Sequence, residues 1–198
     1  GLPRLTGLFN GLGGLASGLV AWSEFHAHPA GQGLFGGLLL WLCAVLGYLA
    51  FSGSAIAWAR TQAWHMSGDP VRFSWLHYLA KAVLLLVVVT GIMFLRDTVA
   101  PGAYRYFALF SLLALLLGAL IVLPLDSAGI PAANYMLNGY AGLAACSAGF
   151  IFQNMLLVGA GALVAASSFR LMLVMCKAGG GSVVAILAGS FQAPSGSK

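Results

Sequence analysis

Two asparagines, Asn10 and Asn138, are the residues of this sequence whose type and surroundings could support chemistry. Each lies in an apolar run of helical length, 3–22 and 131–150, among glycines and alanines. An amide in an apolar environment costs several kcal/mol unless it is hydrogen-bonded, so each must face protein or water. The two amides could line a hydrated path for protons, or they could hold helices together through hydrogen bonds. Both interpretations stay open, and in either case we expect Asn10 and Asn138 to lie near one another if their helices line the same axis.

The two runs follow one pattern. Pro3 stands seven residues before Asn10, and Pro131 stands seven residues before Asn138. Each asparagine is followed by glycine and then by a Gly-Leu-Ala step. A second arm follows each run and carries small hydroxyl residues, in segments 51–58 and 165–169. Serine hydroxyls inside a helix can simply bond the carbonyl four residues earlier. The pattern predicts an internal repeat of two helical hairpins.

Composition places the chain in a membrane. It has 198 residues, of which 61% are hydrophobic and 7% are charged, against about 25% charged in soluble domains. Only helices and closed barrels can span lipid, and the long apolar runs lack the alternation of a barrel strand. We therefore predict an all-α fold, a polytopic membrane helix bundle of about six transmembrane helices, at 3–23, 33–60, 74–96, 103–125, 131–151 and 154–177. The third and fourth helices are rich in Leu and Val, and we expect them to face lipid.

The basic residues predict how the bundle is oriented. An even number of spans puts both termini on one side, so helices 1–2 and 5–6 form a parallel repeat. Seven basic residues would lie on the terminal side and two on the other, so the positive-inside rule places the termini in the cytosol or mitochondrial matrix. The seven are Arg4, Arg60, Arg72, Lys81, Arg170, Lys177 and Lys198, and the two are Arg96 and Arg105. The predicted location is a bacterial or mitochondrial inner membrane.

Several functions are disfavoured by the same residues. The net charge of +5 is explained by orientation, so we expect no nucleic-acid partner. We interpret Cys43, Cys146 and Cys176 as small packing residues with no metal or disulfide role. No Asp, Glu or His falls in the middle of a predicted helix, and no nucleotide-binding turn is present, so we expect no catalysis by this chain alone and no cofactor bound by it. The predicted domains are a transmembrane helical domain at 1–178 and a flexible linker or tail at 179–198.

Five segments of the chain carry a resemblance to a known family. They are LPRLTGLFNGLGGLASGLVAW, FSGSAIAWAR, PAANYMLNGYAGLAACSAGF, NMLLVGAGALVAASSFRLMLVMCKA and SVVAILAGSF. In this order they resemble membrane helices of the proton-translocating NAD(P) transhydrogenase beta subunit. The resemblance implies an enzyme that couples hydride transfer from NADH to NADP to proton movement across the membrane, with NAD(H) and NADP(H) bound on separate soluble domains. It also implies a proton path at Asn10, Ser54 and Asn138.

The chain departs from the family pattern at several positions. Some family members have His at the position of Asn10, while others have Asn and use a histidine on a different helix. Acidic residues that the family often has before the proline of helix 5 and near the start of helix 2 correspond to Gly129 and about Gly33.

Three functions remain open. The chain could be the membrane proton-channel portion of a working transhydrogenase, whose titrating group lies on a partner chain. It could be a transhydrogenase-derived structural subunit of a larger (respiratory) membrane complex, without catalysis of its own. It could also be an unrelated channel or carrier with its site between helices 1 and 5. The amides present in both copies favour the first. The expected partners are membrane lipid, other transhydrogenase subunits or domains and, under the second reading, a larger membrane complex.

Overall fold

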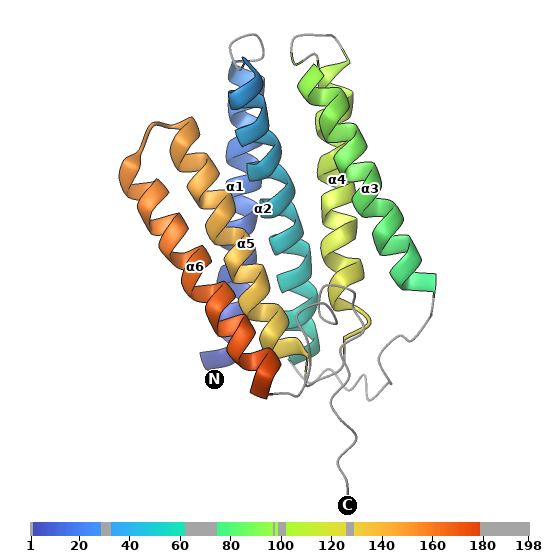
Figure 1. The fold of residues 1–198 in the computed structure, drawn as a ribbon, viewed down its shortest axis with the longest axis vertical. Coiled ribbons are helices and arrows are strands. Elements are labelled where there is room, and N and C mark those ends of the chain that lie inside the picture. The colour runs from blue at the N-terminus through green and yellow to red at the C-terminus, as the bar shows by residue number, and fades with distance from the viewer. Residues whose placement is uncertain are drawn as a thin grey trace, which may run out of the picture.

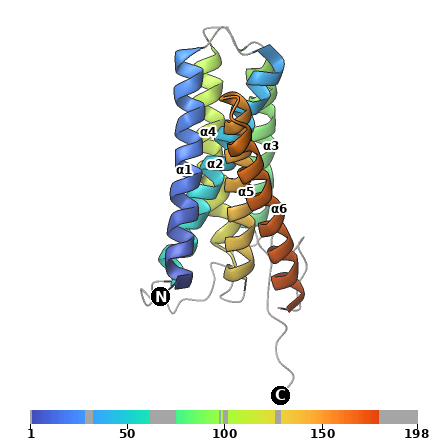
Figure 2. The same ribbon diagram turned by 90° about the vertical axis from the view of Figure 1, so that its left-hand side faces the viewer.

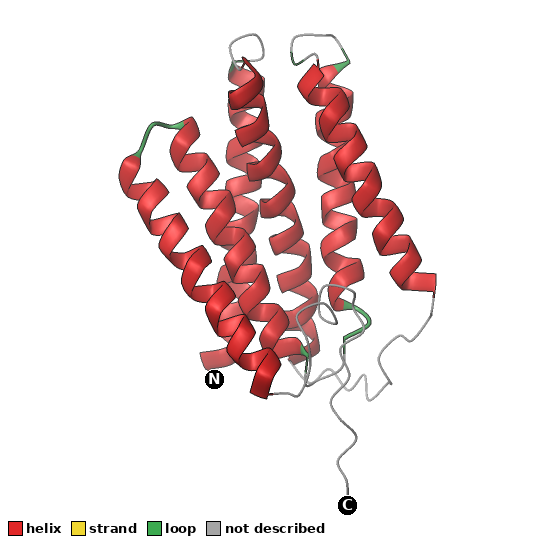
Figure 3. Cartoon of the chain, in the orientation of Figure 1, coloured by secondary structure: helices red, strands yellow, loops and turns green. Residues whose placement is uncertain are grey.

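The described part of the chain is all-helical. The computed structural model describes residues 2–28, 33–61, 75–96, 98, 102–125 and 129–178. In that part of the chain the regular elements are α1 (Leu2–Ala27), α2 (Gly33–Thr61), α3 (Trp75–Arg96), α4 (Ala103–Val122), α5 (Ile130–Ile151) and α6 (Met155–Ala178). Figure 3 shows these helices and no strand among the described residues. The predicted all-α fold is confirmed. The predicted tail at 179–198 and the basic residues Arg72 and Lys198 lie outside the described residues.

Two helix ends differ from the prediction. α1 continues to Ala27, because Phe25 packs into the core and Glu24 pairs with His28 one turn later, at 3.0 Å. α4 ends at Val122 rather than at residue 125. Leu123 still has helical backbone angles and donates its N–H to the Ala119 carbonyl, but Pro124 has no backbone N–H with which to continue the helix. Both ends are therefore set by a neighbouring contact or by local backbone chemistry.

The helices alternate in direction along the bundle. α1, α3 and α5 run one way, and α2, α4 and α6 run the other, so the start of α1 and the end of α6 lie at the same end (Figure 1). α2 is the central helix and contacts α1, α3, α4 and α5. α5 packs between α1, α2 and α6 (Figure 2). α3 packs mainly on α4, at the opposite edge of the bundle from α6 (Figure 1). The parallel orientation of α1 and α5 agrees with the predicted parallel repeat.

Five of the six described helices are long and apolar enough to cross a membrane on their own. The exception is α5, which carries two asparagines and many glycines and alanines. Its 22 residues correspond to about 33 Å, close to the ~30 Å of a bilayer core. α5 can be less apolar than its neighbours because α1, α2 and α6 surround most of it. The one described helix that is not apolar enough to cross a membrane on its own is thus well shielded by its neighbours.

α3 and α4 both have exposed apolar side chains. α3 exposes large apolar residues such as Leu85 and Ile92, as expected for a lipid-facing helix. α4 also exposes leucines, at Leu109, Leu112 and Leu116, but its other face, with Phe107 and Phe110, is buried in the bundle. α4 packs closely on α2 at Gly118, where a side-chain carbon would meet the Leu49 carbonyl. A glycine in the Leu-rich run, rather than its hydropathy, marks this contact.

An aromatic cluster joins α1 to the α3–α4 hairpin. Phe25 of α1 stacks on Phe107 of α4, with ring centroids 4.9 Å apart and planes 6° apart. Phe94 of α3 meets the Phe25 ring edge-on at 5.2 Å, and Phe110 packs against both Phe94 and Phe107. This cluster lies at the end of the bundle where α1 and α3 finish, away from the asparagines.

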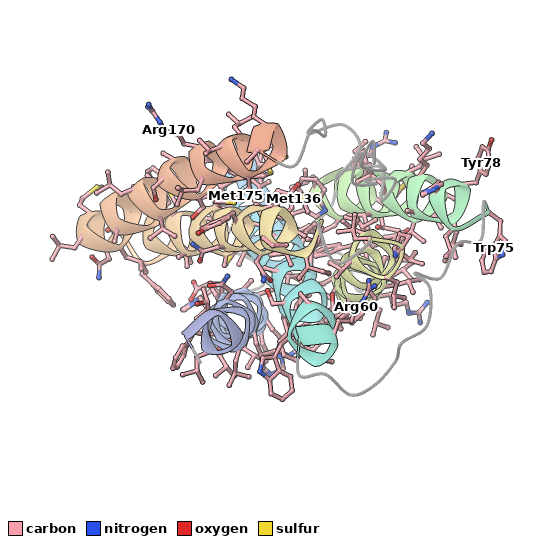
Figure 4. All side chains as sticks on the ribbon, turned by 90° about the horizontal axis from the view of Figure 1, so that it is seen from below. Arg60, Trp75, Tyr78, Met136, Arg170 and Met175 are labelled. Carbon is pink, nitrogen blue, oxygen red and sulfur yellow. The ribbon has the colours of Figure 1, made fainter. Side chains whose placement is uncertain are left out.

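Arg60 ties the end of α2 to the end of α4. Its Nη1 donates hydrogen bonds to the carbonyls of Val122 and Leu123, both at 3.1 Å, where the last carbonyls of α4 lack partners within the helix. We expect Arg60→Ala to lower the free energy of unfolding by about 1–3 kcal/mol, because the Leu123 carbonyl loses this donor, while the Val122 carbonyl keeps the backbone N–H of Leu125 at 3.2 Å. Unfolding in mixed micelles measures this value. Arg170→Ala is the control, since Arg170 is exposed and points away from the bundle (Figure 4), and an equal loss there would contradict the prediction.

Candidate functional site

The two hairpins are each closed by a glycine crossing. A side-chain carbon at Gly14 of α1 would lie 2.6 Å from the carbonyl oxygen of Gly47 on α2. In the second hairpin, a carbon at Gly142 of α5 would lie 2.9 Å from the carbonyl oxygen of Gly161 on α6. At both crossings backbone packs directly on backbone, which only glycine permits.

The same register continues one turn to either side. Gly14 faces the backbone nitrogen of Phe51, as Gly142 faces that of Ala165. Gly47 faces the backbone nitrogen of Gly18, as Gly161 faces that of Cys146. These matched contacts confirm the predicted repeat and fix which residues correspond between the two hairpins.

This correspondence identifies the polar pairs of the site. Asn10 and Asn138 each lie four residues before their crossing glycine, so they are counterparts. Ser54 lies three residues after Phe51, and Ser168 lies three residues after Ala165, so they are counterparts too. The repeat therefore places an asparagine of the first arm opposite a serine of the second arm in both hairpins.

In the second hairpin this pair is hydrogen-bonded. The Nδ2 of Asn138 donates to the Oγ of Ser168 at 2.7 Å, and Ser168 is buried at 2% exposure. Gly139, next to Asn138, lies against the ring of Phe169. The Asn138 amide is thus held towards α6, with a buried partner at an ideal distance.

Removing the Ser168 hydroxyl should measure this contact. We expect Ser168→Ala to lower the free energy of unfolding by about 1 kcal/mol, within the range found for interhelical bonds in membrane proteins. The neighbouring Ser167 is exposed and bonds only the Val164 carbonyl of its own helix, at 3.1 Å. Ser167→Ala is therefore the matched control, with little change expected in the same unfolding measurement. Equal effects of the two substitutions would contradict the assignment.

In the first hairpin the corresponding pair is not bonded. Asn10 is 9% exposed, and its Nδ2 donates to the backbone carbonyl of Asn134 on α5, at 3.4 Å. Ser54 is completely buried, and its Oγ has no hydrogen-bond partner among the described residues. Its Cβ would lie 3.4 Å from a side-chain carbon at Gly11, the residue after Asn10. The Asn10 amide thus bonds across to α5, and it does not make the bond to Ser54 that would match the Asn138–Ser168 bond.

Asn134 is a polar residue of this site that the sequence analysis missed. It lies one turn before Asn138 on α5, and its Oδ1 is buried without a hydrogen-bond partner among the described residues. That oxygen would lie 3.8 Å from a side-chain carbon at Gly7 of α1. The signal was present, because two asparagines four residues apart share one face of a helix.

The predicted site residues lie on three helices that contact one another, α1, α2 and α5, but the hydrogen bonds of the described residues do not link them. Asn10 and Asn138 lie on the adjacent parallel helices α1 and α5, and they have different partners. Amides and hydroxyls of this kind donate and accept hydrogen bonds without holding a proton themselves. Within the described helices, no group of three His, Cys, Asp or Glu residues comes together that could hold a metal. The chemistry available to these residues is the ordering of hydrogen bonds inside an apolar bundle.

Comparison with known proteins agrees with this architecture. The family model of the NAD(P) transhydrogenase beta subunit matches residues 1–198. Two curated proteins named NAD(P) transhydrogenase subunit beta, from Rhodospirillum rubrum and from a named strain of that species, are each 35% identical over 151 residues, which is 73% of this chain. The match covers 32% of each relative, so the chain spans about a third of their length. With apolar helices that can span a membrane, this chain is an integral membrane protein and belongs to the NAD(P) transhydrogenase beta subunit family.

Proposed function

We propose that this chain is the membrane portion of a proton-translocating transhydrogenase and that it provides the route by which protons cross. In this proposal, hydride transfer from NADH to NADP is coupled to proton movement across the membrane. Family membership and the apolar helices support the membrane part of the proposal. The observation that carries the proton route is the set of amides and hydroxyls inside the bundle, in which Asn10 and Ser54 are buried and Asn138, of intermediate exposure, bonds the buried Ser168.

In the proposed route, the side chains of Asn10, Ser54 and Asn138 order the water along which protons pass. Side chains that donate and accept hydrogen bonds can order water and pass a proton along it. Neither an amide nor a serine hydroxyl takes up or releases a proton at neutral pH, so the titrating group is supplied by a partner chain or domain. NAD(H) and NADP(H) bind on partner domains, and the other transhydrogenase subunits are the protein partners.

The orientation follows from the positions of basic residues. Arg60 and Lys177 lie near the helix ends beside the start of α1, whereas Arg96 and Arg105 lie at the opposite end of the bundle. The positive-inside rule then places the start of α1 and the end of α6 on the cytosolic or matrix side. The membrane is a bacterial or mitochondrial inner membrane.

Reconstitution of the complete enzyme containing this chain in lipid vesicles tests the proposal. A proton gradient imposed across the vesicle membrane should speed the reduction of NADP by NADH, and an uncoupler should abolish that stimulation. A pH-sensitive dye inside the vesicles should report proton movement during turnover. Hydride transfer that is indifferent to both the gradient and the uncoupler would refute the proposed coupling.

A structural subunit without catalysis of its own is the second candidate. The observation that favours it is that no Asp, Glu or His lies in the middle of any described helix. A purely structural role predicts that assembly of the surrounding complex depends on this chain, while proton movement is unchanged by substitutions at Asn10 and Asn138. The vesicle measurement on such variants separates the two functions.

A further inference from the structure

The two hairpins of the repeat differ at one hydrogen bond. In the α5–α6 hairpin, Asn138 donates to Ser168 at 2.7 Å. In the α1–α2 hairpin, the counterparts Asn10 and Ser54 are not bonded, and Asn10 donates instead to the carbonyl of Asn134 on α5. The backbone contacts at the two crossings match closely, so the difference lies in the side chains.

The observed bond of Asn10 is a weak one. Its length of 3.4 Å exceeds the 2.9–3.0 Å that is most common for N–H to O bonds. Ser54 meanwhile is at 0% exposure, and its hydroxyl has no partner in the part of the chain that the structure describes, which is an unfavourable state for a buried polar group. Neither end of the arrangement is fully satisfied, whereas a bond from Asn10 to Ser54 would satisfy the serine.

The helices are close enough for that alternative bond. A carbon at Gly11, beside Asn10, would lie 3.4 Å from the Cβ of Ser54, so α1 and α2 are in van der Waals contact at this turn. Gly11 itself places no side chain between α1 and Ser54 at this turn. A bond from Asn10 to Ser54 would be the counterpart of the bond that Asn138 makes to Ser168.

From this asymmetry we infer that Asn10 is a two-position side chain. Its amide alternates between the carbonyl of Asn134 on α5 and the hydroxyl of Ser54 on α2. Asn138, which holds a short bond to Ser168, stays in one position. The role of this movement rests on the proposed function. On a proton route, Asn10 would bond to α5 in one position and to α2 in the other, and it would be the movable residue of the route.

Solid-state NMR on the complete enzyme in lipid tests the inference directly. The subunit is labelled with ¹⁵N and ¹³C asparagine and ¹³C serine, and the Asn10 amide is assigned by its loss in Asn10→Ala. We expect through-space contacts from Asn10 Nδ2 to both the Asn134 carbonyl carbon and the Ser54 Cβ. Asn138 should show one position only. In Ser54→Ala, or in Ser54→Cys where the alanine variant does not assemble, Asn10 should keep only the Asn134 contact.

The matched control is Ser168→Ala, the same change in the second hairpin, which should alter the Asn138 signal and leave both Asn10 contacts in place. An Asn10 amide with a single contact in the unsubstituted enzyme, to either acceptor, would overturn the inference. Proton movement measured on the same vesicles separates this outcome from the proposed function. Two Asn10 positions in an enzyme that moves no protons would refute the proton route and leave the inference standing. A single Asn10 position in an enzyme that moves protons would refute the inference and leave the proton route standing.

Discussion

Gly142→Ala should destabilise the second hairpin, although it adds only one methyl group. That methyl carbon would lie 2.7 Å from the backbone nitrogen of Ala165 and 2.9 Å from the backbone carbonyl oxygen of Gly161. Backbone atoms cannot rotate aside as a side chain can, so α5 and α6 must move apart. We expect a loss of about 1–3 kcal/mol in the free energy of unfolding, the usual cost of overpacking. Gly142→Leu should yield little folded protein.

The same substitution elsewhere in the chain provides the controls. Gly14→Ala should behave like Gly142→Ala, because its methyl carbon would lie 2.6 Å from the Gly47 carbonyl oxygen. Gly13 and Gly159 have no atom within 4 Å of the added carbon. Alanine at either of these should be neutral or slightly stabilising, since alanine favours helix more than glycine does. Unfolding in mixed micelles compares all four variants, and equal stabilities would show that the glycine crossings do not hold the hairpins together.

The helices could be predicted well because a bilayer leaves so few alternatives. Apolar runs of helical length in a chain with 7% charged residues can only be spans or closely packed helices. The end of α1 could not be predicted, since it depends on a contact of Phe25 with Phe94 and Phe107 that connects distant parts of the chain. Hydropathy likewise did not indicate which face of α4 is buried, because lipid-facing and protein-facing positions are equally apolar.

The repeat was predictable because the residues that define it lie close to one another in sequence within each run. The spacing of Pro3 to Asn10 and of Pro131 to Asn138 is set by the start of each helix and the crossing that follows it. The difference between the two copies was not predictable in the same way. It arises because α1 has α5 beside it, so Asn10 has an acceptor on a helix outside its own hairpin.

The candidate site was therefore only partly accessible from the sequence. Asn10, Ser54 and Asn138 were identified, and their positions on α1, α2 and α5 follow from the helix assignment. Asn134 has no asparagine counterpart in the first run, so the repeat does not mark it. The four-residue spacing of Asn134 and Asn138 could have indicated its side chain, whereas its backbone carbonyl, the acceptor of the Asn10 bond, leaves no signal in the sequence. Its recognition needs the packing of α1 against α5.

Asn138→Ala should lower coupled hydride transfer in the complete enzyme by at least about tenfold, which corresponds to about 1.4 kcal/mol in the activation barrier. The proposed route loses its amide, while the fold loses only one interhelical hydrogen bond, to Ser168. Assembly should stay intact, because Gly139 and Gly142 on the same helix still pack against α6. The measurement is gradient-driven reduction of NADP by NADH in vesicles, with the amount of assembled enzyme determined in parallel.

Ser168→Ala separates the two roles that Asn138 could have. It removes the same hydrogen bond, but it keeps the amide in the bundle. If the bond is only a structural contact, the two substitutions should lower the rate equally. If the amide orders the proton route, Asn138→Ala should be much the more severe, and Ser168→Ala should retain most of the coupled rate. An unchanged rate in Asn138→Ala, with proton movement intact, would remove Asn138 from the route and return it to the role of holding α5 against α6.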